Sequence, residues 1–509
     1  MNAAVNAVQA VPAARPRLVV GIVVDQLRTD YIEYLSSYFG EKGFRTLMGD
    51  GVYFRDVDYQ TAPLDAVSAT ASLFTGAYPA YTGVPQAFVH ENDALRPALA
   101  GEGVSITNDS FTPERLRLTT LSDEIAVDGN GTSLIYSVAT DPQQAVVMAG
   151  HAGKAALWIN NTSGNWAGSS YYGSLPTPAS TRNLRQSLYH RLDTMTWTPS
   201  ARLKEVPGIS ELKKKYPFKH RFNTSDRDAY NKFNASALAN AEVTDMAIAL
   251  LSELPKGGET RGIDMLNVGY TLAPFKYAGP NSRAELADSY LRLDSQLSRL
   301  IEAVDRYVGR DNALIWLTST GYYDEAVAEE SRFRLPGGEF SAKRAKSLLN
   351  SYLSARHGNA TFVKRITDGR IYLDHKAIEG RGLQVADIAR DAREFIVKMS
   401  GVDDAYTLND ILSSSTDETE RLRRGFDPRT GGDLILRFTP GWAISDDETY
   451  PVKQQRVRES GVATPAFILG TGVEARRVIT PVKAVALAPT LAGMLRIRAP
   501  SGARERSLF

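Results

Sequence analysis

A continuous apolar run near the start of the chain constrains its fold more than any other feature. Residues 18–24 read LVVGIVV, and a carboxylate, Asp25, follows them directly. A strand that is apolar at every position has both faces buried, which is typical of a parallel sheet covered by helices on both sides. Similar short runs recur at residues 265–270, 313–318 and 466–470. We therefore expect an α/β fold built on a mostly parallel sheet.

Two other segments carry the periodicity of helices that pack on such a sheet. In residues 282–308 apolar side chains repeat at spacings of three and four, and Ser282 with Glu285 predicts a capping box at the start. Residues 383–399 show the same apolar stripe. Strands that alternate with helices of this kind place helices on both faces of the sheet.

Two stretches do not follow this alternation. Residues of about 100–235 are rich in Gly, Ser, Asn and Thr, and about 325–430 is a charged, mainly helical block. We expect both to be insertions in a single domain of residues 17–509. Insertions at the carboxyl edge of the strands would form a lid or cap over a site there, because ligands of parallel sheets bind at that edge. Residues 1–16 are either a flexible Ala-rich tail or the remnant of a secretory signal.

The composition excludes several classes of site. Lys and Arg number 59 against 58 Asp and Glu, a formal charge of +1, which argues against a nucleic-acid partner. The chain has no cysteine, so thiolate zinc sites, iron–sulfur clusters and cysteine nucleophiles are excluded. The one basic cluster, residues 213–221, indicates a solvated face, with a polyanion contact as the alternative. No apolar run approaches the roughly 20 residues that a transmembrane helix needs. Any soft-metal site would have to use the six histidines, which are His90, His151, His190, His220, His357 and His375.

Ordered motifs along most of the chain resemble one family. The first is VGIVVDQLR at residues 20–28, followed by the Pro, Ala-Ser, Thr-Gly and Pro-Ala elements of residues 63–83. Further matches lie at residues 149–158, 170–173, 279–282, 290–294, 371–373 and 488–491. The chain resembles the type I phosphodiesterase/nucleotide pyrophosphatase branch of the alkaline phosphatase superfamily, and within it the bacterial periplasmic alkaline phosphatases. The resemblance implies an alkaline phosphatase-like core with cap insertions, and export to the periplasm or cell envelope.

The same resemblance implies a zinc-dependent site that this chain has largely lost. In the family two zinc ions, held by three Asp and three His, activate a Thr or Ser at a helix start. Carried over position by position, the nucleophile falls at Ala66 and the one retained ligand is Asp25. The other five ligand positions hold Leu272, Lys276, Thr320, Gly321 and Ala463. The substrate-clamping groups fall at Ala87, Asp141 and Gln143. We therefore expect no bound metal and no other cofactor.

These losses predict a catalytically inactive homologue that acts as a binding or scaffolding protein of the cell envelope, with another envelope protein as its partner. The alternative is an active phosphoric-ester hydrolase, a phosphomonoesterase or phosphodiesterase, with a rebuilt site. In that case Ser68, Thr70 or Thr320 would supply the nucleophilic hydroxyl.

Three residues of the site region carry separate expectations. We expect Asp25 to be structural, because one carboxylate cannot hold a zinc ion that takes four ligands. Lys276 either forms an ion pair with Asp25, in place of the lost metal charge, or lies on the surface of a loop. His151 does not fall at a ligand position, and we expect it to be a hydrogen-bonded structural residue.

Overall fold

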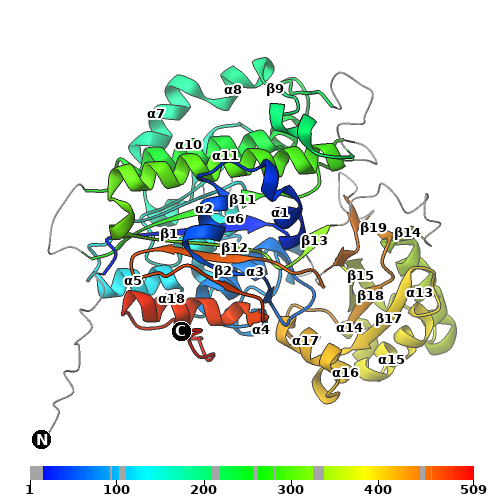
Figure 1. Cartoon of the computed structure of the whole chain (residues 1–509). Helices are drawn as coiled ribbons and strands as arrows, with labels where there is room; N and C mark the ends of the chain where they lie inside the picture. The colour runs from blue at the N-terminus through cyan, green and yellow to red at the C-terminus, as the bar shows by residue number, and fades with distance from the viewer. Residues whose placement is uncertain are drawn as a thin grey trace, which may run out of the picture.

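In the computed structural model a nine-stranded sheet runs through the centre of the molecule (Figure 1). The structure describes residues 15–91, 94–101, 110–208, 218–255, 262–278, 282–324, 337–446, 453–459 and 461–509. Residues 1–14 of the expected tail and residues 213–217 of the basic cluster lie outside these ranges. In sheet order the strands are β23 (Arg476–Val478), β2 (Val52–Phe54), β22 (Ala466–Gly470), β12 (Ala313–Ser319), β1 (Leu18–Asp25), β11 (Asp264–Thr271), β6 (Ile135–Ala139), β7 (Ala155–Ile159) and β8 (Trp166–Gly168).

The apolar run at the start of the chain forms the central strand β1. It pairs in parallel with β11 on one side and β12 on the other. Successive side chains point to opposite faces, so Val20 and Ile22 enter one core cluster while Val19 and Val23 enter the other. β6 and β7 continue the parallel part, whereas β22 and β8 run antiparallel to their neighbours β12 and β7. The predicted mostly parallel α/β sheet is confirmed.

Helices cover both faces of this sheet, as expected (Figure 1). One face carries α1 (Thr29–Leu35), α2 (Phe44–Asp50), α10 (Ala237–Leu251) and α11 (Arg283–Tyr307). The other carries α3 (Ala66–Thr75), α5 (Leu121–Asp128), α6 (Pro142–Ala149) and α18 (Leu487–Leu495). The predicted capping box of α11 is wrong, because the Ser282 side chain makes no cap hydrogen bond. Glu285 instead lies 2.7 Å from the imidazole of His220.

Part of the segment expected to be an insertion belongs to the central sheet. Residues 135–168 supply β6, β7 and β8, whose short sequences, such as IYSVA, lack the long aliphatic run that marks β1. The later part of the segment lies over α10 and α11 (Figure 1). It contains α7 (Thr177–Gln186), α8 (Leu188–Arg191), β9 (Thr196–Trp197), β10 (His220–Arg221) and α9 (Ala229–Asn234).

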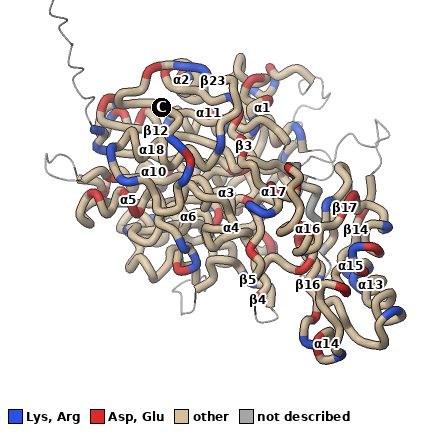
Figure 2. The backbone as a smooth tube through the Cα atoms, turned by 90° about the horizontal axis from the view of Figure 1, so that it is seen from below, with Lys and Arg blue, Asp and Glu red and all other residues tan. Residues whose placement is uncertain are grey.

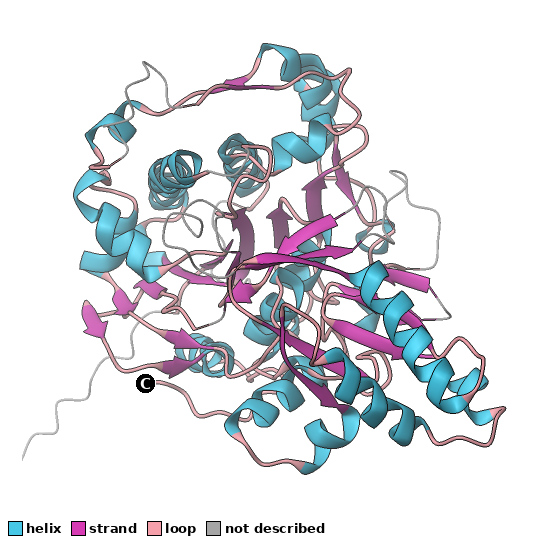
Figure 3. Cartoon of the chain, turned by 90° about the vertical axis from the view of Figure 1, so that its right-hand side faces the viewer, coloured by secondary structure: helices cyan, strands magenta, loops and turns pink. Residues whose placement is uncertain are grey.

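Residues 338–446 form a second body with its own apolar core, which we call the cap (Figures 1 and 3). It is a mixed α/β unit rather than the mainly helical block that we expected, because its strands are only four to six residues long and lie between strongly charged helices. The elements are β14 (Gly338–Ser341), α13 (Ala342–His357), β15 (Val363–Thr367), β16 (Arg370–Leu373), α14 (His375–Glu379), α15 (Val385–Ile396), β17 (Val402–Thr407), α16 (Leu408–Ser413), α17 (Asp417–Gly425), β18 (Leu434–Phe438) and β19 (Trp442–Asp446). α15 confirms the helix predicted over residues 383–399.

Ion pairs join the cap to the core. Arg421 of α17 lies 3.2 Å from Asp58, and Arg117 of the core lies 3.0 Å from Asp427 of the cap. Acidic and basic residues are scattered along the whole backbone, in keeping with the balanced net charge (Figure 2). In the part of the chain that the structure describes, no helix has the length and apolar character needed to cross a membrane.

The remaining short elements are β3 (Val57–Asp58), α4 (Pro79–Thr82), β4 (Phe88–Glu91), β5 (Ala94–Pro97), β13 (Tyr323–Asp324), β20 (Lys453–Arg456), β21 (Arg458–Glu459) and β24 (Val482–Lys483).

Candidate functional site

The carboxyl ends of β1, β11 and β12 bring several of the predicted site residues together. Asp25 lies opposite Thr271, the last residue of β11, and β12 ends at Ser319 on the other side of β1. The residues that follow these strands, Leu272 and Thr320, therefore flank Asp25. The Leu272 N–H donates to the Asp25 carbonyl at 2.9 Å. This is the edge of the sheet where a ligand of an α/β fold is expected.

The Asp25 carboxylate is bound by a hydroxyl from the end of β12. Thr320 Oγ1 donates to Asp25 Oδ1 at 2.8 Å and accepts from the Gln26 N–H at 3.0 Å. Thr320 is fully buried. Such a hydrogen bond offsets part of the cost of holding a carboxylate away from water. The contact ties Asp25 to the neighbouring strand, which agrees with a structural role.

Tyr59 fills the space beside Gly321. A Cβ atom at Gly321 would lie 2.1 Å from Cδ2 of the Tyr59 ring, and Gly321 has a φ of 77°. The Tyr59 hydroxyl donates to the Ser319 carbonyl. Burial, together with the nearby charge of Asp25, raises the pKa of Tyr59 well above its usual range. Any side chain at position 321, an imidazole included, would require Tyr59 to move.

Helix α3 begins at Ala66, and the carboxylate of Asp65 caps it. Asp65 Oδ1 accepts from the N–H groups of Val67 at 3.0 Å and Ser68 at 2.8 Å, and Oδ2 accepts from the Ala87 N–H at 2.6 Å. The first N–H groups of a helix have no partner within the helix and attract anions. Here the anion is a side chain of the protein itself.

The side chains at two positions of the expected substrate clamp, Asp141 and Gln143, form hydrogen bonds with backbone groups. Asp141 caps α6, and burial, reinforced by the charge of Asp65, raises its pKa to about 6. Gln143 accepts from the Leu99 N–H at 2.9 Å and donates to the Ala87 carbonyl at 3.0 Å. Its amide thus joins α6 to the segments that flank the β4–β5 hairpin.

The three hydroxyls considered as replacement nucleophiles are fully buried. Ser68 Oγ accepts from the Asp65 N–H at 3.2 Å, and Thr70 Oγ1 donates to the Ala66 carbonyl at 2.6 Å. The third, Thr320, is bound to Asp25 as described. All three hydroxyls therefore have hydrogen-bond partners within the fold.

The two remaining predicted positions lie on loops. Lys276 is exposed, and its Nζ lies 5.2 Å from the centre of the Tyr277 ring. Its ion pair with Asp25 stays a prediction. The carbonyl of Ala463 accepts from the Thr29 N–H at 3.0 Å, so the loop before β22 contacts the start of α1.

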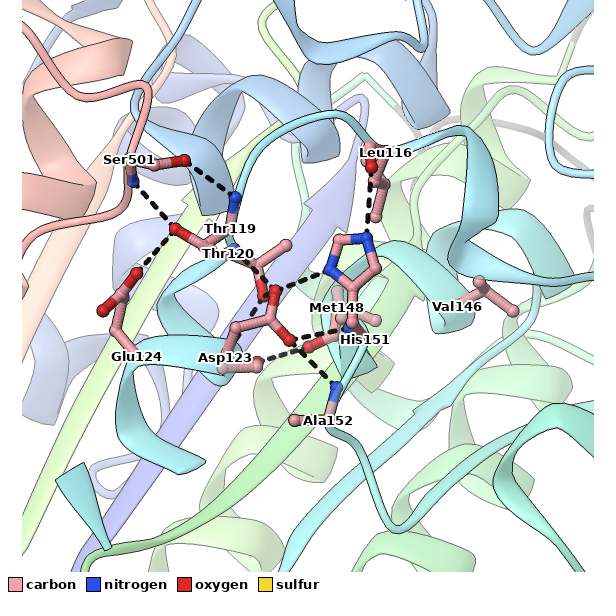
Figure 4. Close-up of polar contacts among 12 residues, drawn as sticks. Leu116, Thr119, Thr120, Asp123, Glu124, Val146, Met148, His151, Ala152 and Ser501 are labelled. Carbon is pink, nitrogen blue, oxygen red and sulfur yellow. Dashed lines mark hydrogen bonds and ion pairs between the residues drawn. The ribbon is translucent and has the colours of Figure 1, made fainter. Parts of the chain in front are cut away.

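His151 is a hydrogen-bonded structural residue, as predicted (Figure 4). Its Nδ1 lies 2.9 Å from Asp123 Oδ2, and its Nε2 lies 3.1 Å from the Leu116 carbonyl. Both partners only accept hydrogen bonds, so the doubly protonated imidazolium satisfies both contacts. The bond to Asp123 raises the pKa of His151 against the opposing effect of burial.

The sequence motifs do not point to two residues of this region, Asp65 and Tyr59. Asp65 carries a usable signal, since Asp followed three residues later by Ser68 is a capping-box spacing, and the structure forms that box. Tyr59 carries none, because its contact with Gly321 joins segments far apart in the sequence.

Comparison with known proteins decides the family. The model of the family described as type I phosphodiesterase / nucleotide pyrophosphatase matches residues 19–463. The chain belongs to this family. A protein named calcium-transporting ATPase from Myroides odoratus is 24% identical over 521 residues, covering 96% of this chain and 93% of the relative. Alkaline phosphatase PafA of Elizabethkingia meningoseptica is 26% identical over 522 residues, with coverage of 96% and 93%.

The crystal structure of wild-type PafA superposes with a TM-score of 0.83 and 23% identity, covering 98% of this chain and 99% of that one. The predicted alkaline phosphatase-like fold is confirmed. Membership of the alkaline phosphatase superfamily is confirmed with it.

The residues at the expected ligand positions do not fit a pair of zinc ions. Zinc in proteins takes about four nitrogen, sulfur or oxygen donors. The side chains at positions 272, 321 and 463 offer no donor atom, and the hydroxyl of Thr320 is engaged with Asp25. Within the described ranges, no group of three or more His, Cys, Asp or Glu side chains is placed to hold a metal ion.

Proposed function

We propose that this chain is a catalytically inactive member of its family, which acts as a binding or scaffolding protein of the cell envelope. The start of α3 carries this proposal. A methyl group, that of Ala66, stands at the position assigned to the nucleophile, and it cannot attack phosphorus. The N–H groups that would receive an oxyanion there are bound by the carboxylate of Asp65.

The ligand positions support the same proposal. Only Asp25 of the six has a side chain suited to zinc, and Thr320 donates a hydrogen bond to it. Burial of the other candidate hydroxyls, Ser68 and Thr70, argues against a rebuilt nucleophile. Export to the periplasm or cell envelope, with a partner there, is part of the proposal and is supported by the family resemblance.

Zinc content and phosphoesterase activity test the proposal together. Purified protein is assayed with p-nitrophenyl phosphate and bis(p-nitrophenyl) phosphate, with and without added Zn²⁺, beside PafA as a positive control. We expect substoichiometric zinc and no zinc-dependent turnover. The matched variant Ala66→Thr restores a hydroxyl at the helix start, and we expect it to be equally inactive because the ligand positions are unchanged.

Stoichiometric zinc together with turnover that Asp25→Asn abolishes would overturn the proposal in favour of an active phosphoric-ester hydrolase. Fractionation of the producing cells by osmotic shock tests the location. We expect the protein in the periplasmic fraction, and its recovery only with the cytoplasm would contradict export.

A further inference from the structure

Arg370, the first residue of β16, is a fully buried arginine with most of its hydrogen-bonding capacity unused. Its exposed fraction is 0%. Nη1 donates to the Gly431 carbonyl at 3.1 Å. Nε and Nη2 have no hydrogen-bond partner among the residues that the structure describes. A buried charged group normally has its donors satisfied, so these two nitrogens require an explanation.

The two unused nitrogens form one edge of the guanidinium. The N–H bonds of Nε and Nη2 point in the same direction and match two oxygens of one carboxylate or phosphoryl group. The same edge is filled elsewhere in this chain. Nε and Nη2 of Arg55 each lie 2.9 Å from a different oxygen of Glu33. The empty edge of Arg370 is therefore an oxyanion-binding geometry without its oxyanion.

The surroundings place this edge at the joint between the cap and the core. Tyr372 lies two residues after Arg370 on β16. Its ring packs against the ring of His90 of β4, with the two ring centres 4.7 Å apart. The Tyr372 hydroxyl donates to the Thr430 carbonyl at 3.2 Å, in the loop after α17 that also holds Gly431. Arg370 thus lies where cap residues meet the core hairpin.

No side chain of the described residues compensates the charge of Arg370 directly. Tyr372, Asp368 and Asp65 of the core are near enough to raise its pKa, but within the described residues none of them hydrogen-bonds to Nε or Nη2. Both oxygens of Asp65 already accept from backbone N–H groups. Burial lowers the pKa of Arg370, but an arginine stays protonated at any ordinary pH.

We propose that the Nε–Nη2 edge of Arg370 binds an oxyanion, a carboxylate or a phosphoryl group, enclosed between the cap and the core. Arg370 is not one of the positions assigned to the zinc ligands or the nucleophile. The site would exist whether or not the chain is catalytic, so it stands independently of the proposed function.

Anion content of the purified protein tests this proposal first. The nitrogens are shielded from solvent, so an enclosed oxyanion is expected to remain bound through purification in a chloride buffer. The protein is denatured, and released phosphate, sulfate and organic acids are measured by ion chromatography and mass spectrometry. We expect about one equivalent from the native protein and none from Arg370→Gln. The matched control Arg55→Gln removes a guanidinium whose edge already holds Glu33, and we expect it to retain the anion.

Thermal unfolding provides a second readout. At equal ionic strength, phosphate or acetate should raise the Tm of native protein and of Arg55→Gln relative to chloride, and should not raise that of Arg370→Gln. A larger effect of phosphate assigns a phosphoryl ligand, and a larger effect of acetate assigns a carboxylate. Should Arg370→Gln fail to fold, Arg370→Lys keeps the charge without the paired edge and replaces it.

Two results would overturn the proposal. One is native protein that releases no oxyanion and unfolds at the same temperature in all three salts, which would mean that only water fills the edge. The other is an anion released in equal amount from the native protein and the Arg370 variants, which would place it elsewhere.

Discussion

Replacing Asp141 by Asn should stabilise the protein at neutral and alkaline pH. Asp141 caps α6 through its side-chain oxygen, and Asn serves an N-cap as well as Asp does. The helix therefore keeps its acceptor. The substitution removes a carboxyl group whose pKa burial and the charge of Asp65 raise from 3.8 to about 6.

The magnitude follows from that pKa. A carboxyl group with a higher pKa in the folded than in the unfolded state favours folding while it is protonated, and this contribution is lost as the pH rises through about 6. The difference between 3.8 and about 6 means that the folded state has lost about 3 kcal/mol of stability at pH 8 relative to acidic pH. About half of this loss has already occurred at pH 5. Asp141 keeps partial contact with solvent, which screens its charge, so we expect Asp141→Asn to gain about 1–2 kcal/mol at pH 8.

Urea denaturation at pH 5 and pH 8 measures the free energy of unfolding of the native protein and the variant. Asp374→Asn is the matched control. Asp374 also caps a helix, α14, but its carboxylate lies 4.0 Å from the ammonium of Lys364, so its replacement should not stabilise at either pH. An Asp141→Asn variant that is no more stable than the native protein at pH 8, or that gains as much at pH 5, would refute the reasoning.

Three further substitutions test contacts of the site by the same denaturation assay. Thr320→Val leaves the buried N–H of Gln26 without its acceptor and should lower the free energy of unfolding by about 1–3 kcal/mol. Thr320→Ser keeps the hydroxyl and should lower it less. Equal losses of stability in the two variants would contradict the role of the hydroxyl. Gly321→Ala places a methyl group against Tyr59 at a positive φ and should cost about 1–3 kcal/mol, and a neutral effect would show that the ring yields freely. The pKa of His151 is raised in the folded state, so its ion pair stabilises below about pH 6.5 and this contribution is lost as the pH rises through the folded pKa. His151→Ala should therefore cost more at pH 5 than at pH 9, and the reverse order would contradict this sign.

The central strands could be predicted from the sequence because burial on both faces leaves a direct signal. β1 is apolar at seven consecutive positions, and β12 and β22 also show short aliphatic runs. β6 and β7 are equally buried, but their Ala, Ser and Tyr residues do not distinguish a strand from a loop. The strands of the cap were missed because they do not alternate: β16 is buried at every position, β18 at all but one, and β15 has two successive basic residues.

The positions of the candidate site could be assigned from family motifs, whereas their contacts could not. Asp25, Leu272 and Thr320 come together because three parallel strands end side by side, which the strand prediction already implies. The packing of Tyr59 against Gly321 depends on how distant loops fold over that edge. No local pattern encodes such a contact.

The carboxylate at the start of α3 has a consequence for any attempt to restore phosphate binding there. The chain holds the carboxylate of Asp65 within hydrogen-bond distance of the helix N–H groups, so Asp65 acts as a tethered competitor. An N-cap side chain of this kind contributes about 0.5–2 kcal/mol, and an added anion would have to offset this contribution before it could bind. Because the competitor is part of the chain, dilution cannot remove it, and it lowers the apparent affinity for any added anion. Re-engineering this helix start would therefore have to begin at Asp65 and only then turn to Ala66.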